Sequence, residues 1–350
     1  MTGESVDMKP VRFGMVGYGF GGRYFHTPLI AAAPECDLVA VMTSSPERQA
    51  LVAREVPGAR TFGSLAELVD AGVEAVAIST PADTHSSVTE QALQLGLAVV
   101  CDKPFALNPD AARHTVALAE ERGLMLSPYQ NRRWDSDFRT VRKRVAEGAL
   151  GTVTRMESRF ERWAPERGPG RSGGGTLLDF GSHLVDQALV LLGPAGAVYA
   201  EWRIRESGLE DDVFMALTHA GGARSQLWGS WSQSAPGPRY RVTGTTASYV
   251  LGPADTEEDL LLAGETPASL GERWGVEPPD TYGTLYTGTT SVPYATDRGR
   301  WDLFYPTFAR AVRGLNSAPV NPHDAVASTT VLEAARVSAT TGAVVPVPQS

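Results

Sequence analysis

The chain has 350 residues, 42% of them hydrophobic and 20% charged, and a formal net charge of −9 at pH 7. This composition is that of a folded protein, and the length exceeds what one hydrophobic core usually serves, so two domains are expected. The acidic balance argues against nucleic acid as a partner. The absence of long apolar runs argues against a membrane span, and the two cysteines, Cys36 and Cys101, suit a cytoplasmic protein.

The first third of the chain alternates short apolar runs with helical patterns. The runs cover residues 11–16, 38–42, 73–79, 97–101 and 124–127. They are apolar throughout, as expected for parallel strands that helices cover on both faces. Between them, Ser64 with Glu67 predicts a capping box, and Asn108–Pro109 with Gly123 predicts the two ends of another helix. Residues 1–128 are therefore predicted to form a doubly wound α/β domain.

A different pattern predicts an α+β domain over residues 129–350, with a large, mostly antiparallel open sheet. A helix is expected at 134–147, a strand at 152–163, a loop at 165–175, a helix at 176–193 and several strands within 197–251. The segment 253–300 is predicted to be a long surface loop, and two helices are predicted at 301–314 and 323–341. The two loop segments are expected to set specificity.

The first strand runs directly into Gly17-Tyr-Gly19-Phe20-Gly21-Gly22, a G-x-G-x-x-G pattern. Such glycines allow a tight turn and bring backbone N–H groups close to a pyrophosphate at a helix N-terminus. A plain glycine turn is the alternative. The strand before the motif and the helical pattern after it favour dinucleotide binding, so the domain is predicted to be an NAD(P)-binding Rossmann domain.

The second strand ends at Thr43, Ser44 and Ser45, with Arg48 shortly after. NAD-binding domains usually carry a carboxylate here for the ribose 2′-hydroxyl. Hydroxyl groups and a guanidinium suit a 2′-phosphate instead, so NADP is preferred over NAD. Ser45–Pro46 could also simply cap the next helix.

Further candidate residues follow two other strands and lie on one later helix. Thr80, Pro81 and His85 follow the strand at 73–79, and Lys103 with Pro104 follows the strand at 97–101, where open α/β sheets bind their ligands. Asp179, His183 and Asp186 are spaced to share one face of a helix. A histidine can accept a proton at neutral pH, although an incidental histidine near a helix N-terminus is the alternative.

Five segments, GYGFGGRYFHTPLI, STPADTH, CDKPF, YQNRRWDSDF and GGGTLLDFGSHLVD, resemble in order and spacing the Gfo/Idh/MocA family of oxidoreductases. The similarity is strongest to its NADP-dependent scyllo-inositol dehydrogenase branch. It implies catalytic roles for Lys103, Asp179 and His183, a cofactor contact at Asn131 and a substrate contact at Arg132. Asp102 stands where the family motif E-K-P has glutamate.

The resemblance implies hydride transfer between NAD(P) and a secondary alcohol or ketone of a cyclic polyol or sugar. His183 would act as general base, Lys103 would hold the reacting oxygen, and Asp179 would orient the substrate and the other two groups. Another sugar or carbonyl substrate, or a non-catalytic NADP-binding regulator, are the alternatives. No metal is expected because H-E-x-x-H and C-x-x-C are both absent.

A homodimer or homotetramer is expected to form through the second sheet. Trp228 and Trp231, three residues apart, should lie on opposite faces of that sheet, and one or both should be exposed in a monomer.

Overall fold

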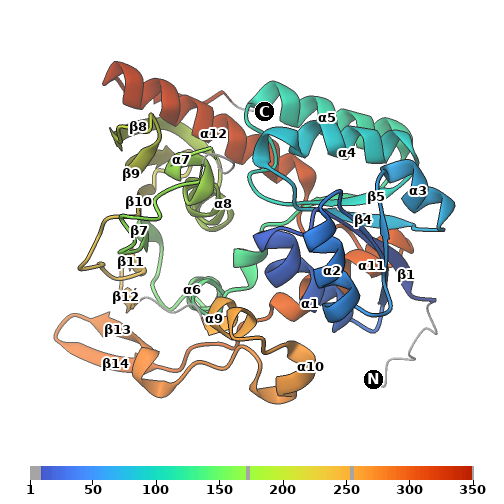
Figure 1. Cartoon of the computed structure of the whole chain (residues 1–350). Helices are drawn as coiled ribbons and strands as arrows, with labels where there is room; N and C mark the ends of the chain where they lie inside the picture. Colours follow the sequence, from blue (N-terminus) through green and yellow to red (C-terminus); the bar gives the residue numbers. More distant parts are fainter. Residues whose placement is uncertain (1–8, 171–173, 253–255, 349–350) are drawn as a thin grey trace.

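The computed structural model describes residues 9–170, 174–252 and 256–348. Two sheets lie side by side, each with helices packed on it (Figure 1). Parts of the two predicted loops, residues 171–173 and 253–255, lie outside the described residues. Within the described ranges, no helix is both long and apolar enough to cross a membrane.

The first sheet is parallel and has six strands in the order β3-β2-β1-β4-β5-β6. Its strands are β1 (Val11–Val16), β2 (Cys36–Met42), β3 (Arg60–Phe62), β4 (Ala75–Ile78), β5 (Ala98–Cys101) and β6 (Leu126–Pro128). The order reverses at β1, which places the ends of β1 and β4 at the switch point where such sheets bind ligands. The doubly wound sheet predicted from the sequence is therefore confirmed. β3 was not predicted, because it has three residues and none of them is fully buried.

Helices cover both faces of the first sheet. They are a π-helical turn (Gly22–His26), α1 (Thr27–Ala31), α2 (Pro46–Glu55), α3 (Leu65–Asp70), α4 (His85–Gln94) and α5 (Pro109–Arg122). Local sequence sets their ends as predicted: Ser64 and Glu67 form the capping box of α3, and Asn108 caps α5. Gly123 ends α5 with φ +62°, a conformation that favours glycine.

The second sheet is mixed and has nine strands in the order β14-β13-β12-β11-β7-β10-β9-β8-β15. They are β7 (Val153–Glu161), β8 (Ala195–Ile204), β9 (Glu210–His219), β10 (Arg224–Ser230), β11 (Tyr240–Gly244), β12 (Ser248–Leu251), β13 (Gly283–Thr287), β14 (Thr290–Tyr294) and β15 (Val345–Pro346). β7 and β10 pair in parallel, and the other pairs are antiparallel. The predicted mostly antiparallel sheet is confirmed.

Helices pack on one face of this sheet, and Figure 1 shows α7 and α8 on the side turned toward the first sheet. The helices of this half are α6 (Ser136–Ala146), α7 (Thr176–Asp179), α8 (Gly181–Leu192), α9 (Thr256–Leu262), α10 (Pro267–Leu270), α11 (Phe304–Val312) and α12 (Pro322–Thr341). One helix was expected at 176–193, but the structure has α7 and α8, which meet at Phe180.

The prediction of a surface loop over residues 253–300 is wrong. The described part of this segment contains α9, α10, β13 and β14, and Trp274 is fully buried. The segment is rich in Gly, Pro and Thr, which hides short elements from a periodicity analysis. Its apolar residues are buried through contacts with distant parts of the chain, which local pattern does not report.

α11 returns to the first sheet although it comes late in the sequence. Phe304, Tyr305 and Phe308 share a core with Phe13 of β1, and the Phe13 and Tyr305 rings meet edge to face at 5.6 Å. Division of the chain into domains at residues 128 and 129 stays a prediction, and any such division must assign α11 to the face of the first sheet.

Candidate active site

The glycine motif forms a turn between β1 and the π-helical segment that only glycine fits. Gly17 has φ +93°, and a Cβ there would lie 2.5 Å from the carbonyl oxygen of Ser79. A Cβ on Gly22 would lie 2.1 Å from the carbonyl oxygen of Gly17, whereas Gly19 has nothing within 4 Å. The first and third glycines therefore close the turn, and the second leaves open space beside the backbone, as a bound pyrophosphate requires.

A cavity of about 650 Å³ extends from this turn to the second sheet. Fourteen of its 28 lining residues were not predicted from the sequence. The predicted residues that line it are Gly17, Gly19, Phe20, Gly21, Arg48, Thr80, Pro81, His85, Lys103, Pro104, Asn131, Arg132, Asp179 and His183. One cavity therefore joins the dinucleotide motif to the proposed catalytic residues.

Lys103 and Asp179 form an ion pair across the cavity, from the end of β5 to the end of α7. The Lys103 ammonium donates to the carboxylate of Asp179 and, at 3.5 Å, to its backbone carbonyl oxygen. Both side chains keep about a quarter of their surface exposed, 26% for Lys103 and 22% for Asp179. Since an ammonium group has three donors, Lys103 has donor capacity left for a substrate oxygen.

His183 lies in the first turn of α8 and is only 4% exposed. Its Nδ1 is buried without a hydrogen-bond partner among the described residues, so Nε2 is the ring nitrogen available to a substrate. Burial lowers the pKa of His183 well below 6.5, and the positive charges of Lys103, Arg132, Arg239 and Arg162 lower it further. The ring is therefore neutral, and able to accept a proton, at neutral pH.

Asp102, which stands where the family motif has glutamate, binds the backbone of Lys103. Its carboxylate accepts hydrogen bonds of 2.8 Å from the Lys103 backbone N–H and from the Ser79 hydroxyl. The fully buried His26 places Nε2 3.3 Å from the same carboxylate. Burial alone would raise the pKa of Asp102, but the nearby His26, together with His85 and Lys103, outweighs burial and holds this pKa well below its usual range.

His85 joins the two strand ends on the cofactor side. Its Nδ1 lies 2.7 Å from the Pro104 carbonyl oxygen and its Nε2 2.9 Å from the Thr80 carbonyl oxygen. The loops after β4 and β5 are thereby fixed against each other. This places His85 as a support for the cavity wall as well as a lining residue.

The predicted 2′-phosphate residues do not all reach the cavity. Arg48 lines it, and no carboxylate in the described part of the chain lies within ion-pair distance of its guanidinium. Ser45 instead caps α2, accepting a 3.3 Å hydrogen bond from the Arg48 backbone N–H, as the alternative prediction had it. Thr43 is 7% exposed and does not line the cavity, nor do Gly22 and the exposed Ser44.

Arg132 and Asp186, both singled out from the sequence, form ion pairs with other side chains of the protein. The Arg132 guanidinium, although it lines the cavity, binds Asp135 at 3.2 Å and also Glu258. Asp186, expected on one face with Asp179 and His183, does not line the cavity. It is 2% exposed and accepts hydrogen bonds of 2.8 and 2.5 Å from Arg133. The break at Phe180 puts Asp179 on α7 and leaves His183 and Asp186 together on α8, where the ion pair with Arg133 holds Asp186 outside the cavity.

The sequence analysis did not assign several lining residues to the site. They are Phe25, Ser79, Ala82, Asp102, Tyr129, Phe160, Arg162, Arg167, Gly168, Gly170, Phe180, Trp231, Glu258 and Trp301. Asp102 and Ser79 could have been found, because they stand at strand ends beside predicted residues. Glu258 could not, since it lies in α9, within the segment expected to be a loop.

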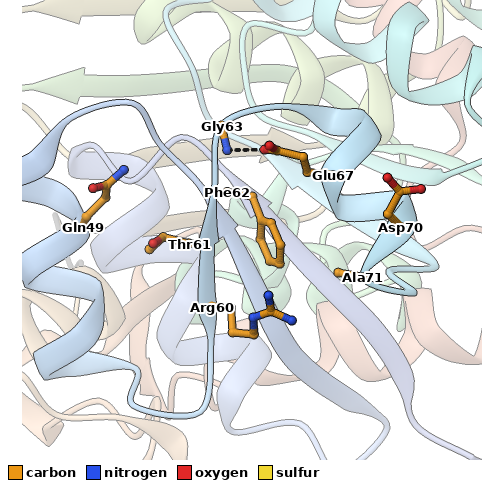
Figure 2. A pocket seen from close by; sticks show the side chains of 8 residues that line it. All are labelled: Gln49, Arg60, Thr61, Phe62, Gly63, Glu67, Asp70 and Ala71. Carbon is orange, nitrogen blue, oxygen red and sulfur yellow. Dashed lines mark hydrogen bonds between the residues drawn. The ribbon is translucent and has the colours of Figure 1, made fainter.

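A second hollow, of about 460 Å³, lies at the outer edge of the first sheet (Figure 2). Glu67 lines it, but its carboxylate accepts a 2.7 Å hydrogen bond from the Gly63 N–H and serves the cap of α3. This hollow holds none of the motif residues. Within the described ranges, no group of three His, Cys, Asp or Glu side chains could hold a metal ion either.

Comparison with known proteins agrees with this geometry. Residues 11–130 match the oxidoreductase family with an NAD-binding Rossmann fold, and residues 138–250 match the GFO/IDH/MocA C-terminal domain. The scyllo-inositol 2-dehydrogenase (NADP(+)) IolW of Bacillus subtilis is 32% identical over 94% of this chain and 93% of its own. The oxidoreductase YdgJ of Escherichia coli, an uncharacterized protein, is 35% identical over 90% of this chain and 92% of its own.

Solved structures share the whole fold. An oxidoreductase from Klebsiella pneumoniae superposes with a TM-score of 0.88 at 34% identity, covering 97% of this chain and 96% of its own. The oxidoreductase yvaA from Bacillus subtilis superposes with a TM-score of 0.90 at 30% identity, covering 97% and 99%. With both domain profiles matched in sequence order, the chain belongs to the Gfo/Idh/MocA family of oxidoreductases.

Proposed function

We propose that this protein is an NADP-preferring dehydrogenase that interconverts a secondary alcohol and a ketone on a cyclic polyol or sugar. The observation that carries the proposal is the Lys103–Asp179 ion pair beside His183, in the same cavity as the glycine turn. Three relatives act on cyclic polyols or sugars by name: IolW, an inositol 2-dehydrogenase from Rhizobium meliloti, and a 1,5-anhydro-D-fructose reductase from Ensifer adhaerens.

The residues around the glycine turn fit a dinucleotide. Gly17, Gly19 and Gly21 would face the pyrophosphate, and Thr80, Pro81 and Asn131 would line the remainder of the binding cleft. Arg48 supports NADP over NAD because its guanidinium has no carboxylate partner in the described structure and suits a 2′-phosphate. When bound, the cofactor supplies the acceptor or donor of the hydride.

The three proposed catalytic residues have different roles in the removal of the hydroxyl proton. His183 takes the proton of the reacting hydroxyl group on Nε2, for which its lowered pKa keeps the ring neutral. Lys103 donates to the same oxygen and stabilises its negative charge as the proton leaves. Asp179 fixes the Lys103 ammonium, and no hydrogen bond links it to His183 in the described structure. Asp179 therefore positions Lys103 directly, whereas it has no hydrogen bond through which to position the His183 ring.

The experiment that tests this function is a screen of cyclic polyols, aldoses and their ketones with NADP(H) and NAD(H), followed by absorbance of the reduced cofactor. Turnover of at least one cyclic polyol or sugar, with loss of turnover in His183→Ala, is the expected result. Tight NADPH binding without turnover of any member would favour the non-catalytic regulator. Turnover restricted to unrelated carbonyl compounds would favour the alternative substrate class.

Two further properties belong to the same proposal. A homodimer or homotetramer would form through the face of the second sheet that carries no helix, and a cytoplasmic location suits the two free cysteines, Cys36 and Cys101. A small molecule is the only partner class that the cavity requires.

A further inference from the structure

Three aromatic rings form a continuous stack in the wall of the cavity, on the side of the second sheet. Phe160 and Phe180 stack with ring centroids 4.3 Å apart, and Phe180 and Trp231 with centroids 4.7 Å apart; both pairs have an interplanar angle of 23°. All three residues line the cavity. Phe180 directly follows Asp179, and the Phe160 ring lies 6.1 Å from that of His183. The stack is therefore next to the proposed reacting centre.

Trp231 ends this stack and presents carbon to the cavity. Its side chain is partly exposed, but Nε1 is buried and has no hydrogen-bond partner among the described residues. The accessible part of the indole is therefore its carbon surface. At the other end of the stack the Arg132 guanidinium lies 4.6 Å from the Phe160 ring centre, which holds that ring in place.

Charged and polar side chains line the cavity around the proposed reacting centre, and the stack is an aromatic surface beside them. Lys103, Asp179, His183, Arg162 and Glu258 line the same space, and Arg162 donates to Glu258 at 2.8 Å. A substrate with hydroxyl groups around its rim and an apolar face would satisfy both surfaces at once. C–H bonds carry partial positive charge and are attracted to the negative face of an aromatic ring.

We propose that Trp231, backed by Phe180 and Phe160, is the platform for one C–H face of a six-membered ring substrate. This makes Trp231 the residue that selects cyclic substrates with equatorial hydroxyl groups over open-chain polyols. In such rings the axial C–H bonds alternate between the two faces, so three of them point together at each face, whereas an open chain must be ordered to do so and loses conformational entropy. The inference rests on the proposed function and narrows its substrate class.

A matched control residue lies on the neighbouring segment. The backbone of Trp163 bridges that of Ser232, the residue after Trp231. Adjacent residues of extended chain point to opposite sides, so Trp163 points away from the cavity that Trp231 and Arg162 line. Its 63% exposure agrees with this. Trp163→Ala therefore removes the same side chain from the same region without touching the platform.

The test measures kcat/KM for scyllo-inositol and for the open-chain hexitol sorbitol in the parent and in Trp231→Ala, Trp231→Phe and Trp163→Ala. Trp231→Ala should lower kcat/KM for scyllo-inositol about threefold to tenfold, mainly through KM, the range expected for one aromatic contact. Sorbitol should change less than twofold, Trp231→Phe should keep most of the parent value, and Trp163→Ala should match the parent.

Calorimetry provides a readout that needs no turnover. Binding of scyllo-inositol to the NADPH-bound protein, a non-productive pair, should weaken in Trp231→Ala while NADPH affinity stays at the parent value. Equal losses for scyllo-inositol and sorbitol, or weakened NADPH binding, would overturn the platform while leaving the dehydrogenase assignment intact. Should the parent neither bind nor oxidise any cyclic polyol or sugar, the proposed function itself fails. Circular dichroism of each variant identifies a folding defect. If Trp231→Ala has such a defect, the comparison of scyllo-inositol with sorbitol is made in Trp231→Phe.

Discussion

The ammonium group of Lys103 donates a hydrogen bond to the carboxylate of Asp179. One residue follows β5 of the first sheet and the other ends α7 on the second sheet, so this pair fixes the two halves of the proposed site against each other. The rate and affinity effects below follow from that arrangement.

Lys103→Met and His183→Ala should each lower kcat severely while NADPH affinity stays nearly unchanged. Neither side chain belongs to the glycine turn, and a general acid–base group is typically worth about 10²–10⁴-fold in rate. Steady-state kinetics with the best substrate, together with calorimetric NADPH binding, measures both effects. His323→Ala is the control, because His323 is exposed on α12 and pairs with Glu120. Near-parental turnover in His183→Ala would place the base elsewhere.

The oxidative kcat/KM should be level at neutral pH and should fall only in acid. Burial and nearby positive charges disfavour the protonated ring of His183, so its pKa lies well below 6.5. His183 is therefore fully in its neutral, proton-accepting form at neutral pH, and this form is lost as the pH falls through the lowered pKa. Arg162→Gln removes one of these charges and should move the inflection to higher pH. An inflection above pH 7 in the parent, in a pH range where the protein stays folded, would contradict this.

NADPH should bind more tightly than NADH, and Arg48→Ala should narrow the difference. Loss of a charge-assisted contact with the 2′-phosphate should cost on the order of 1–3 kcal/mol of NADPH binding free energy and leave NADH unchanged. Calorimetry with both cofactors measures the gap. Arg54→Ala serves as control, since Arg54 lies on the same helix but pairs with Glu55 outside the cavity. Equal affinities in the parent are the outcome that removes the basis for an NADP preference.

Light scattering should give a dimer or tetramer rather than the 37.3 kDa monomer. Leu227 of β10 is fully buried on the helix side, while Trp228 on the opposite face is half-buried under Arg159, whose guanidinium lies 4.0 Å from the ring. Neither Trp228 nor Trp231 is strongly exposed, and Trp231 belongs to the cavity, so Trp228 alone is retained as an interface candidate. Trp228→Glu should shift the mass toward the monomer. A parent that is monomeric at micromolar concentration would refute the proposed assembly.

The sequence by itself predicted five of the six strands of the first sheet and the glycine turn, and its resemblance to the family indicated the proposed catalytic residues. Parallel strands are buried on both faces, so β1, β2, β4, β5 and β6 read as apolar runs, and Ser64, Asn108 and Gly123 mark helix ends by local hydrogen bonding. The roles of Gly17 and Gly22 could also be predicted from the sequence, because the steric demand of a tight turn involves only a few neighbouring residues. Lys103 was readable from its place after a strand.

Only the tertiary structure decided which of the remaining side chains meet. Nothing in the spacing of Asp179, His183 and Asp186 shows that α7 ends at Asp179 or that Arg133 holds Asp186 outside the cavity. The stack of Phe160, Phe180 and Trp231 joins residues from three separate segments, and Glu258 arrives from α9, in a segment without periodicity. Such contacts depend on how distant segments pack, and that packing sets both the burial that lowers the pKa of His183 and the surface offered to a substrate.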